Sequence, residues 1–462
     1  MKPLSMVTRK PIFNHIASLS THRIPVSSIT SRLISSYSVH KMASDTPAAA
    51  AAVTSAADVS YKPRYIDIGI NLADPVFRGR YHGVQRHPDD LDAVISRGQE
   101  VGCQKLIITG SDFKSSRNAI KIAQQYPGTV YTTAGIHPCS SAIFGTKHTS
   151  DSREGHSTPC DPDPEAPTPE DHDPDPVKSR QIISDLRALI EEARSTHPTA
   201  LVAFGEFGLD YDRLPLCGRK IQLHSFAAQL DLVLSLRPQL PLFLHSRAAH
   251  ADFVGLLKEK CGPRLEKLEK GGVVHSFTGT ADELRELMDL GLHIGANGCS
   301  FKTAENCEVV RAMRLDRLML ETDGPWCEVR PSHEGWKYLV ASHKASKGES
   351  TSTPDASTTP TLTPGTATPA ASTPGTSTPV SDQAGQQPRK SKKPQRKEPE
   401  VPERWRSVKK EKWAEGCMIK SRNEPCSIER VGAVVAAIKG TSIEEVCEAA
   451  WRNTQAVFEL ED

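Results

Sequence analysis

The sequence lacks any apolar run long enough to cross a membrane or to form the core of a signal peptide. It also lacks a Cys-x-x-C pair, and its 11 cysteines are odd in number and scattered along the chain. Such a pattern fits reduced thiols inside a cell better than a disulfide framework or a zinc-thiolate site. These absences argue against a membrane-spanning protein and a disulfide-stabilised secreted domain, and no feature of the chain indicates an obligate protein partner.

A strong net charge is missing too. The formal net charge is +1 at pH 7, so no global basic field would attract nucleic acid, although this balance leaves room for a local basic patch. Aromatic residues make up 5% of the chain and apolar residues 37%. These low values follow from low-complexity stretches that dilute an otherwise ordinary core, so the foldable part is shorter than the chain.

The first 60 residues are expected to be a disordered presequence and linker. Residues 1–44 contain six Lys or Arg and no acidic residue. Together with the abundant serine, this composition is typical of a mitochondrial transit peptide, and the alternative is a plain disordered tail. Met42 offers an internal start, which would give a cytoplasmic or nuclear form without the presequence.

Two further low-complexity stretches interrupt the chain. Residues 145–179 form an acidic insertion, with seven prolines and nine acidic residues between His148 and Lys178. Residues 344–400 form a Ser/Thr/Pro/Gly/Ala tract that ends in the basic run 389–397. We expect both stretches to be disordered, since neither can bury a core. The basic run is compatible with a nuclear signal, a nucleic-acid contact or a solvated linker end.

The remaining segments, 61–343 and 401–462, repeat short apolar strands and amphipathic helices. Strands that alternate with helices at this spacing are typical of β-α units around a parallel sheet. Eight repeats predict an α/β fold of the closed (β/α)₈ TIM-barrel type, which C-terminal helices in 401–462 complete. The predicted strands are 66–72, 106–108, 130–136, 201–206, 242–244, 273–274, 292–295 and 318–320.

Several of these strands end in a residue type that binds metal ions. Glu206, flanked by glycines, ends the fourth strand, and a histidine follows each of the next two. A charged residue at the end of an apolar strand is costly to bury unless something neutralises it. In a TIM barrel the carboxyl ends of all strands lie on one face, where the working groups sit. The sequence therefore predicts one site built from Asp67, His137, Glu206, His245, His275 and Asp323.

Around these residues the chain resembles the TatD-type metal-dependent deoxyribonucleases, within the wider group of amidohydrolase-like metal barrels. The resemblance extends from Tyr65 to Phe458, apart from the two insertions, and any one of its motifs alone would be weak. The motifs are Asp67-Ile68-Gly69-Ile70-Asn71-Leu72, Ala134-Gly135-Ile136-His137-Pro138, Gly205-Glu206-Phe207-Gly208-Leu209-Asp210, Phe243-Leu244-His245-Ser246-Arg247, Val274-His275-Ser276-Phe277-Thr278-Gly279, Glu321-Thr322-Asp323-Gly324-Pro325-Trp326 and Arg422-Asn423-Glu424-Pro425.

The resemblance implies that Glu206, His245, His275 and Asp323 bind one or two divalent ions. It also implies cleavage of phosphodiester bonds in DNA from a 3′ end, so DNA is the expected substrate. Magnesium is the expected ion, although manganese, zinc, cobalt and nickel suit the same ligand types. Many related barrels have a His-x-His pair on the first strand. This chain has Asp67-Ile68-Gly69 there, so we expect Asp67 to form a structural hydrogen bond rather than to bind metal.

Within this site we assign catalytic roles to Glu206 and Asp323. Glu206 would hold or bridge the ions, and Asp323 would bind an ion and accept a proton from the attacking water. Arg247 and His137 are predicted to bind substrate. Arg247 would contact a phosphate through its fork of donors, and His137 would contact the same phosphate or the leaving oxygen.

Two other functions are compatible with the sequence. The same site could hydrolyse another ester, such as a misacylated tRNA, since related barrels act on diverse substrates. A non-catalytic scaffold with a degenerate metal site would agree with the missing His-x-His pair. Ser246 and Ser276 lack a nucleophile-elbow pattern, which argues against serine-dependent hydrolysis. Asp210 and Glu424 are expected to orient ligands or loops rather than to react.

Overall fold

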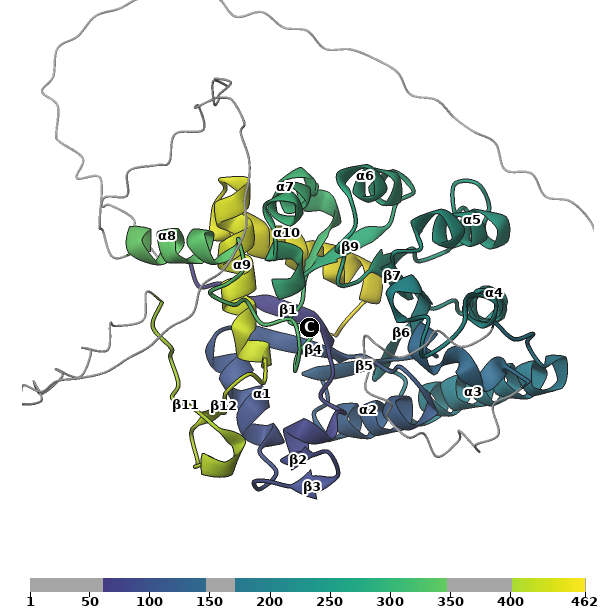
Figure 1. Ribbon diagram of the computed structural model, residues 1–462, viewed down its shortest axis with the longest axis horizontal. Helices are drawn as coiled ribbons and strands as arrows, with labels where there is room; N and C mark the ends of the chain where they lie inside the picture. Colours follow the sequence, from purple (N-terminus) through teal and green to yellow (C-terminus); the bar gives the residue numbers. More distant parts are fainter. Residues whose placement is uncertain (1–60, 147–170, 347–400, 462) are drawn as a thin grey trace, which may run out of the picture. The chain divides into compact units, whose positions relative to one another are not determined.

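The computed structural model describes residues 61–146, 171–346 and 401–461, which fall in a single unit of the chain (Figure 1). The predicted presequence 1–60 lies outside the described residues. So do most of the predicted acidic insertion 145–179 and nearly all of the predicted tract 344–400 with its basic run.

Eight parallel strands form one sheet whose spatial order follows the chain. The last strand is joined to the first through the loop that follows it: the Asp323 amide donates to the Gly69 carbonyl and the Asn71 amide to the Gly324 carbonyl, each over 2.8 Å. The sheet is therefore a nearly closed barrel, and the predicted (β/α)₈ fold is confirmed. The strands are β1 (Tyr65–Ile70), β4 (Cys103–Ile108), β5 (Val130–Ala134), β6 (Leu201–Asp210), β7 (Leu242–Arg247), β8 (Gly272–Val274), β9 (His293–Ala296) and β10 (Leu318–Leu320).

Helices follow the strands in turn and pack on the outside of the sheet (Figure 1). Several begin with side-chain caps that the sequence supplies locally, such as Thr280 before α6 and Ser442 before α10. The helices are α1 (Leu91–Glu100), α2 (Phe113–Gln125), α3 (Pro176–Thr196), α4 (Arg219–Ser235), α5 (His250–Cys261), α6 (Ala281–Asp289), α7 (Ala304–Ala312), α9 (Ile428–Lys439) and α10 (Ile443–Phe458).

The structure adds one helix that the sequence pattern did not indicate, α8 (Trp336–Ser346). Leu339 is buried, and Trp336, Tyr338 and Val340 pack partly buried against the same core. Two predicted boundaries also differ from the observed elements. Helix α8 continues past residue 343, and α3 begins at Pro176, inside the predicted insertion, because Asp175 caps the amides of the next two non-proline residues.

The barrel interior holds its own apolar cluster, separate from the layer between strands and helices. Alternate strand residues such as Ile66, Ile68 and Phe243 point inward, as the two-residue period of a strand requires. Helix α10 adds Trp451 and Phe458 to this cluster, and its Asn453 donates to the carbonyl of Leu318 at the amino end of β10. The opposite face, at the carboxyl ends, is left for polar side chains.

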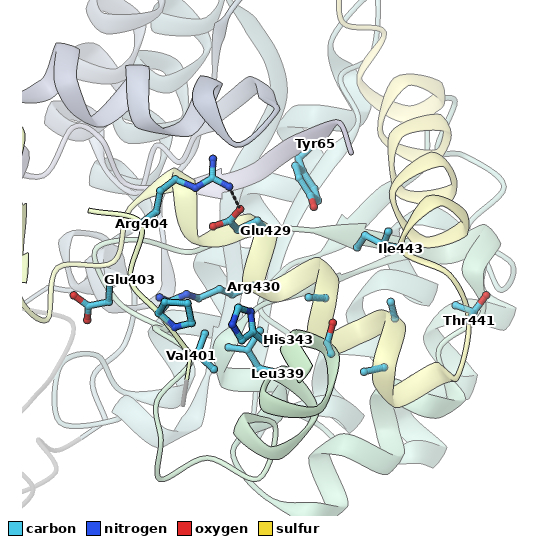
Figure 2. A pocket seen from close by; sticks show the side chains of 15 residues that line it. Tyr65, Leu339, His343, Val401, Glu403, Arg404, Glu429, Arg430, Thr441 and Ile443 are labelled. Atoms are coloured by element: carbon cyan, nitrogen blue, oxygen red, sulfur yellow. Dashed lines mark hydrogen bonds and ion pairs between the residues drawn. The ribbon is translucent and has the colours of Figure 1, made fainter. Parts of the chain in front are cut away.

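A cavity of about 690 Å³ lies outside the barrel, between α8, α9 and residues 401–404. Figure 2 shows Arg404 turned toward Glu429 on one wall, and their side chains form an ion pair of 3.1 Å. No lining residue comes from the carboxyl end of a strand, so this cavity is distinct from the predicted site.

Among the described helices, none combines the length and apolar character that spanning a membrane requires.

Candidate metal centre at the carboxyl ends of the strands

Three imidazoles converge on one carboxylate oxygen at the mouth of the barrel. The Oε1 atom of Glu206 lies 2.6 Å from His275 Nε2, 2.9 Å from His245 Nδ1 and 3.4 Å from His137 Nε2. Glu206 and His245 lie in the carboxyl-terminal halves of β6 and β7, His137 and His275 come after β5 and β8, and all four are buried. We call His137, Glu206, His245 and His275 the Glu206 cluster.

The local backbone directs the Glu206 side chain into the mouth. The pairing of β6 with β7 shifts register between Gly205 and Phe207, so Glu206 lies in a bulge that turns its side chain relative to the regular pleat. Gly205 has a φ of +142°, and a side chain there would collide with the backbone of Phe243. Glycine before Glu206 is therefore required by conformation and by space.

Burial and mutual contacts shift the pKa values of the side chains in the Glu206 cluster. Burial opposes the charge of Glu206, but the charges of His275 and His137 and the hydrogen bonds from His245 and His275 hold the pKa of Glu206 well below its usual value. Burial also opposes the charge of His275, yet the neighbouring charges of Glu206 and Glu321 raise its pKa well above the usual value. For His137 burial prevails and lowers the pKa to about 3.

This donor set fits a divalent cation. His137, Glu206 and His245 each offer one donor atom, and these three atoms lie within 4.8 Å of one another. Mixed imidazole and carboxylate ligands suit magnesium, manganese or zinc. The Glu206 carboxylate oxygen attracts the imidazole protons that face it and would also attract a cation that took their place.

The structure groups the predicted ligands differently from the sequence. His137, predicted to contact substrate, lies among the three mutually close donors, whereas His275 reaches the same Glu206 oxygen from another side. Asp323 is not among the close donors. Metal binding by Glu206, His245, His275 and Asp323 stays a prediction, and His137 becomes an additional candidate ligand.

Asp323 lies beside the cluster on the loop after β10. Its Oδ1 accepts a hydrogen bond from Asn71 Nδ2 over 3.1 Å, and its Oδ2 accepts from Cys327 Sγ over 3.2 Å and from Ser276 Oγ over 3.4 Å. Burial, with the charges of Glu321 and Glu206, raises the pKa of Asp323. Asp323 is thus held by neutral donors near the cluster, with its charge destabilised by its surroundings.

The predicted orienting contact of Asp210 is present. Its Oδ2 lies 3.1 Å from His245 Nε2, so the imidazole is held between two carboxylates, Glu206 on one side and Asp210 on the other. This contact sets the ring orientation and leaves Nδ1 directed at Glu206. Arg213 and Arg247 lie 3.2 and 3.8 Å from the same Asp210 oxygen and balance its charge.

Arg247, the second predicted substrate contact, ends β7 on the rim of the site. Its side chain is 23% exposed, and its guanidinium lies near Asp210 and in the field of Asp323. It is therefore close to the cluster and accessible from outside. Phosphate binding by Arg247 stays a prediction.

The predicted structural role of Asp67 agrees with its contacts. Asp67 is fully buried, and its two oxygens accept hydrogen bonds from the Thr322 amide over 2.9 Å and the Thr322 hydroxyl over 2.5 Å. Burial raises the pKa of Asp67 to about 8. A mostly protonated carboxyl that holds the backbone beside Asp323 fits a structural group better than a metal ligand.

Sequence reasoning missed two polar residues of the site, Asn297 and Glu321. Asn297 Nδ2 donates to Ser276 Oγ over 2.9 Å and to Glu321 Oε1 over 3.1 Å. Together they fix the residue that follows His275. Both come directly after a strand, β9 and β10, so the strand-end rule that identified the other residues could have found them.

Comparisons with known proteins point to one family. A family model described as TatD related DNase matches residues 66–350. The Deoxyribonuclease Tat-D of Schizosaccharomyces pombe is 39% identical over 85% of this chain and 94% of its own length. The 3′-5′ ssDNA/RNA exonuclease TatD of Erwinia tasmaniensis is 34% identical over 56% of this chain and 79% of its own length.

Solved structures show the same architecture. An uncharacterized amidohydrolase from Saccharomyces cerevisiae superposes with a TM-score of 0.63 and 28% identity, over 86% of this chain and 100% of that one. A hydrolase of the TatD family from Entamoeba histolytica superposes with a TM-score of 0.60 and 24% identity, over 87% of this chain and 100% of that one. The second likeness supports the fold alone.

Proposed function

Because the chain belongs to the TatD-related DNase family of metal-dependent hydrolases, we propose that the strand-end site hydrolyses phosphodiester bonds of DNA from the 3′ end. The observation that carries the proposal is the convergence of His137, His245 and His275 on one oxygen of Glu206. A relative named as a 3′-5′ ssDNA/RNA exonuclease supports the polarity.

Glu206, His245 and His275 would hold the cation, with His137 as a further candidate and Asp323 completing the shell. A divalent ion at this place would polarise a phosphoryl oxygen and make a bound water more acidic. Magnesium is the ion we propose. The remaining steps depend on residues around the cluster that orient groups or move protons.

Asp323 is proposed to accept the proton of the attacking water. Burial and the neighbouring carboxylates raise the pKa of Asp323, which brings it nearer to the range in which a carboxylate is an effective base. The Cys327 thiol and the Asn71 amide hold its two oxygens, so the carboxylate is oriented before substrate arrives. Asp67 supports the same loop through Thr322.

Arg247 is proposed to bind a non-bridging phosphate oxygen of the DNA strand. Its guanidinium is fixed near Asp210 but remains accessible at the rim. A planar group with several donors can contact two phosphate oxygens at once.

We also propose that the protein acts in mitochondria, since the basic, serine-rich residues 1–44 support import, with Met42 starting a cytoplasmic or nuclear form.

The test is a cleavage assay on single-stranded DNA labelled at the 3′ or the 5′ end, with magnesium and with EDTA. We expect immediate release of the 3′ label, a stepwise shortening of the 5′-labelled strand, and no cleavage with EDTA. His275→Ala should abolish cleavage. The matched control is His224→Ala, because His224 contacts Ser179 outside the site.

Cleavage that persists in folded His275→Ala protein would exclude this site. RNA and a misacylated tRNA, offered in parallel, separate the deoxyribonuclease from a hydrolase of another ester. Binding of DNA without cleavage, under every metal tested, would instead favour the scaffold alternative.

A further inference from the structure

Two cysteines lie side by side next to the candidate catalytic carboxylate. Cys299 belongs to the short helix Gly298–Phe301 after β9, and Cys327 follows the loop after β10. Their sulfur atoms are 2.7 Å apart. A disulfide requires a separation of about 2.05 Å, so the sulfurs need to approach by only about 0.65 Å.

The backbone builds this proximity into the fold. A side chain at Gly298 would collide with the carbonyl of Cys327, so the two segments pack directly against each other. Both thiols are free, and both are shielded from bulk solvent, Cys299 more than Cys327. Packing of the two main-chain segments therefore holds the two cysteines close together, independently of side-chain motion.

Cys327 connects this pair to the hydrolytic site. Its thiol donates a hydrogen bond to Asp323 Oδ2 over 3.2 Å. The thiol has a single proton, which it directs to Asp323 or to Cys299. Once the sulfur is bonded to Cys299 that proton is gone, and Asp323 loses one of the donors that orient it.

We propose that Cys299 and Cys327 are an oxidative modification site, at which a reversible disulfide withdraws the thiol donor from Asp323 and suppresses hydrolysis. The suppression rests on the proposed function of the site. The oxidant is hydrogen peroxide, and a dithiol reductant restores the two thiols.

The chemistry assigns Cys299 as the first sulfur to react. When the Cys327 proton points to Cys299 instead of Asp323, that hydrogen bond and the nearby ammonium of Lys302 lower the pKa of Cys299 to about 7, against the effect of burial. The Cys299 thiolate attacks one peroxide oxygen, which gives a sulfenic acid and, with the released proton, one water. Cys327 then attacks that sulfur, forms the S–S bond and releases a second water. The two sulfurs together lose two electrons, and the peroxide gains them.

The full-length protein, purified with reductant and then treated with stepwise hydrogen peroxide, tests the proposal. Remaining thiols are blocked with N-ethylmaleimide, and peptides are mapped by mass spectrometry without reduction. We expect a peptide joined through Cys299 and Cys327 at the lowest peroxide that modifies any cysteine. Metal-dependent DNA cleavage should fall at least about tenfold with its appearance and recover with dithiothreitol, because Asp323 loses a hydrogen bond to a charged group.

Cys299→Ser should retain basal cleavage within about twofold, since Cys299 does not touch Asp323, and should lose the sensitivity to peroxide. The matched control is Cys307→Ala, a buried cysteine in α7 with no sulfur partner among the described contacts, which should stay sensitive. Failure to find the joined peptide, unchanged cleavage in its presence, or a peroxide-sensitive Cys299→Ser protein each overturns the proposal. Reduced protein that does not cleave DNA would refute the proposed function, whereas the mass spectrum would still decide the modification site.

Discussion

Two buried clusters of charged side chains in this molecule have different compositions and different roles. Arg422 donates to both oxygens of Asp90 over 2.9 and 2.6 Å and to Glu424 over 2.8 Å, and Arg97 donates to Glu424 over 2.7 Å. We call these four residues the closed cluster. Two guanidinium groups balance two carboxylates, so it needs no ion from outside.

The Glu206 cluster has the opposite character. Its positive partners are imidazoles, which become neutral ligands when they lose a proton, whereas a guanidinium keeps its charge. Asp210, Glu321 and Asp323 surround it with further carboxylates. The comparison teaches that a buried carboxylate paired with arginine ties parts of the fold together, while one paired with histidine leaves a place that a cation can take.

The positions of the two clusters agree with this difference. The closed cluster joins α1 and its N-terminal capping position, Asp90, to residues 422–424, which are over 300 positions away in sequence. It so anchors the C-terminal segment to the barrel. The predicted orienting role of Glu424 agrees with these contacts. Asp67 shows a third way to neutralise a buried carboxyl group, because a bound proton removes its charge.

The largest expected effect is on cleavage by Glu206→Gln. The substitution keeps the shape but removes the charge that gathers three imidazoles, so we expect a loss of about 10³-fold or more in kcat/KM, with the barrel still folded. Steady-state cleavage of single-stranded DNA measures it, and circular dichroism verifies the fold. The matched control is Glu286→Gln, which contacts His250 over 2.9 Å at the surface and should leave cleavage unchanged.

Arg422→Ala should break the closed cluster instead. Asp90 and Glu424 would remain buried without their main cation, so we expect the free energy of unfolding to fall by about 3–5 kcal/mol. Urea unfolding measures the loss, and cleavage per folded molecule should be preserved. Arg285→Ala, which removes an exposed ion pair with Asp282, is the control and should cost under about 1 kcal/mol. Equal losses in both variants would refute the comparison.

Asp210→Asn should have an intermediate effect, confined to the metal. The amide cannot stabilise the His245 imidazole as a carboxylate does, so we expect a 10- to 100-fold weaker affinity for manganese, measured by titration calorimetry. Asp212→Asn is the neighbouring control, since the Asp212 side chain makes none of the described contacts to the cluster. An unchanged affinity would show that Asp210 does not orient His245.

The smallest effect concerns Asp67 and pH. The pKa of Asp67 is about 8 in the folded state and about 3.9 in the unfolded state, so between these pH values the folded protein binds one proton that the unfolded protein lacks. The free energy of unfolding therefore falls as the pH rises from about 4 to about 8. Asp67→Asn, a mimic of the protonated carboxyl, should cost less than about 1 kcal/mol near pH 6 and flatten this decline. Urea unfolding between about pH 5 and pH 9 compares the two proteins. A variant with the same slope would show that Asp67 does not titrate there.

Much of the fold could be predicted because its signals are local. The alternation of apolar residues along β1 and the capping residues of α6 and α10 act within a few positions of the chain. Helix α8 was missed because its core-facing residues Trp336, Tyr338, Leu339 and Val340 are crowded into one turn and do not recur along the helix. The length of β6 was underestimated because its last residues, Leu209 and Asp210, follow the polar Glu206. Local periodicity does not report such elements.

Sequence alone determined which residues stand at the strand ends, since that follows from chain order and the rule for parallel barrels. Only the tertiary structure decided how those side chains meet. His275 lies 69 positions from Glu206 and reaches it because a bulge in β6 turns the carboxylate into the mouth of the barrel. The same folding brought Cys299 to Cys327 and Arg97 to Glu424. Such contacts depend on the direction of each side chain and on irregularities of the backbone. No local sequence pattern indicates how two distant residues will be oriented toward each other.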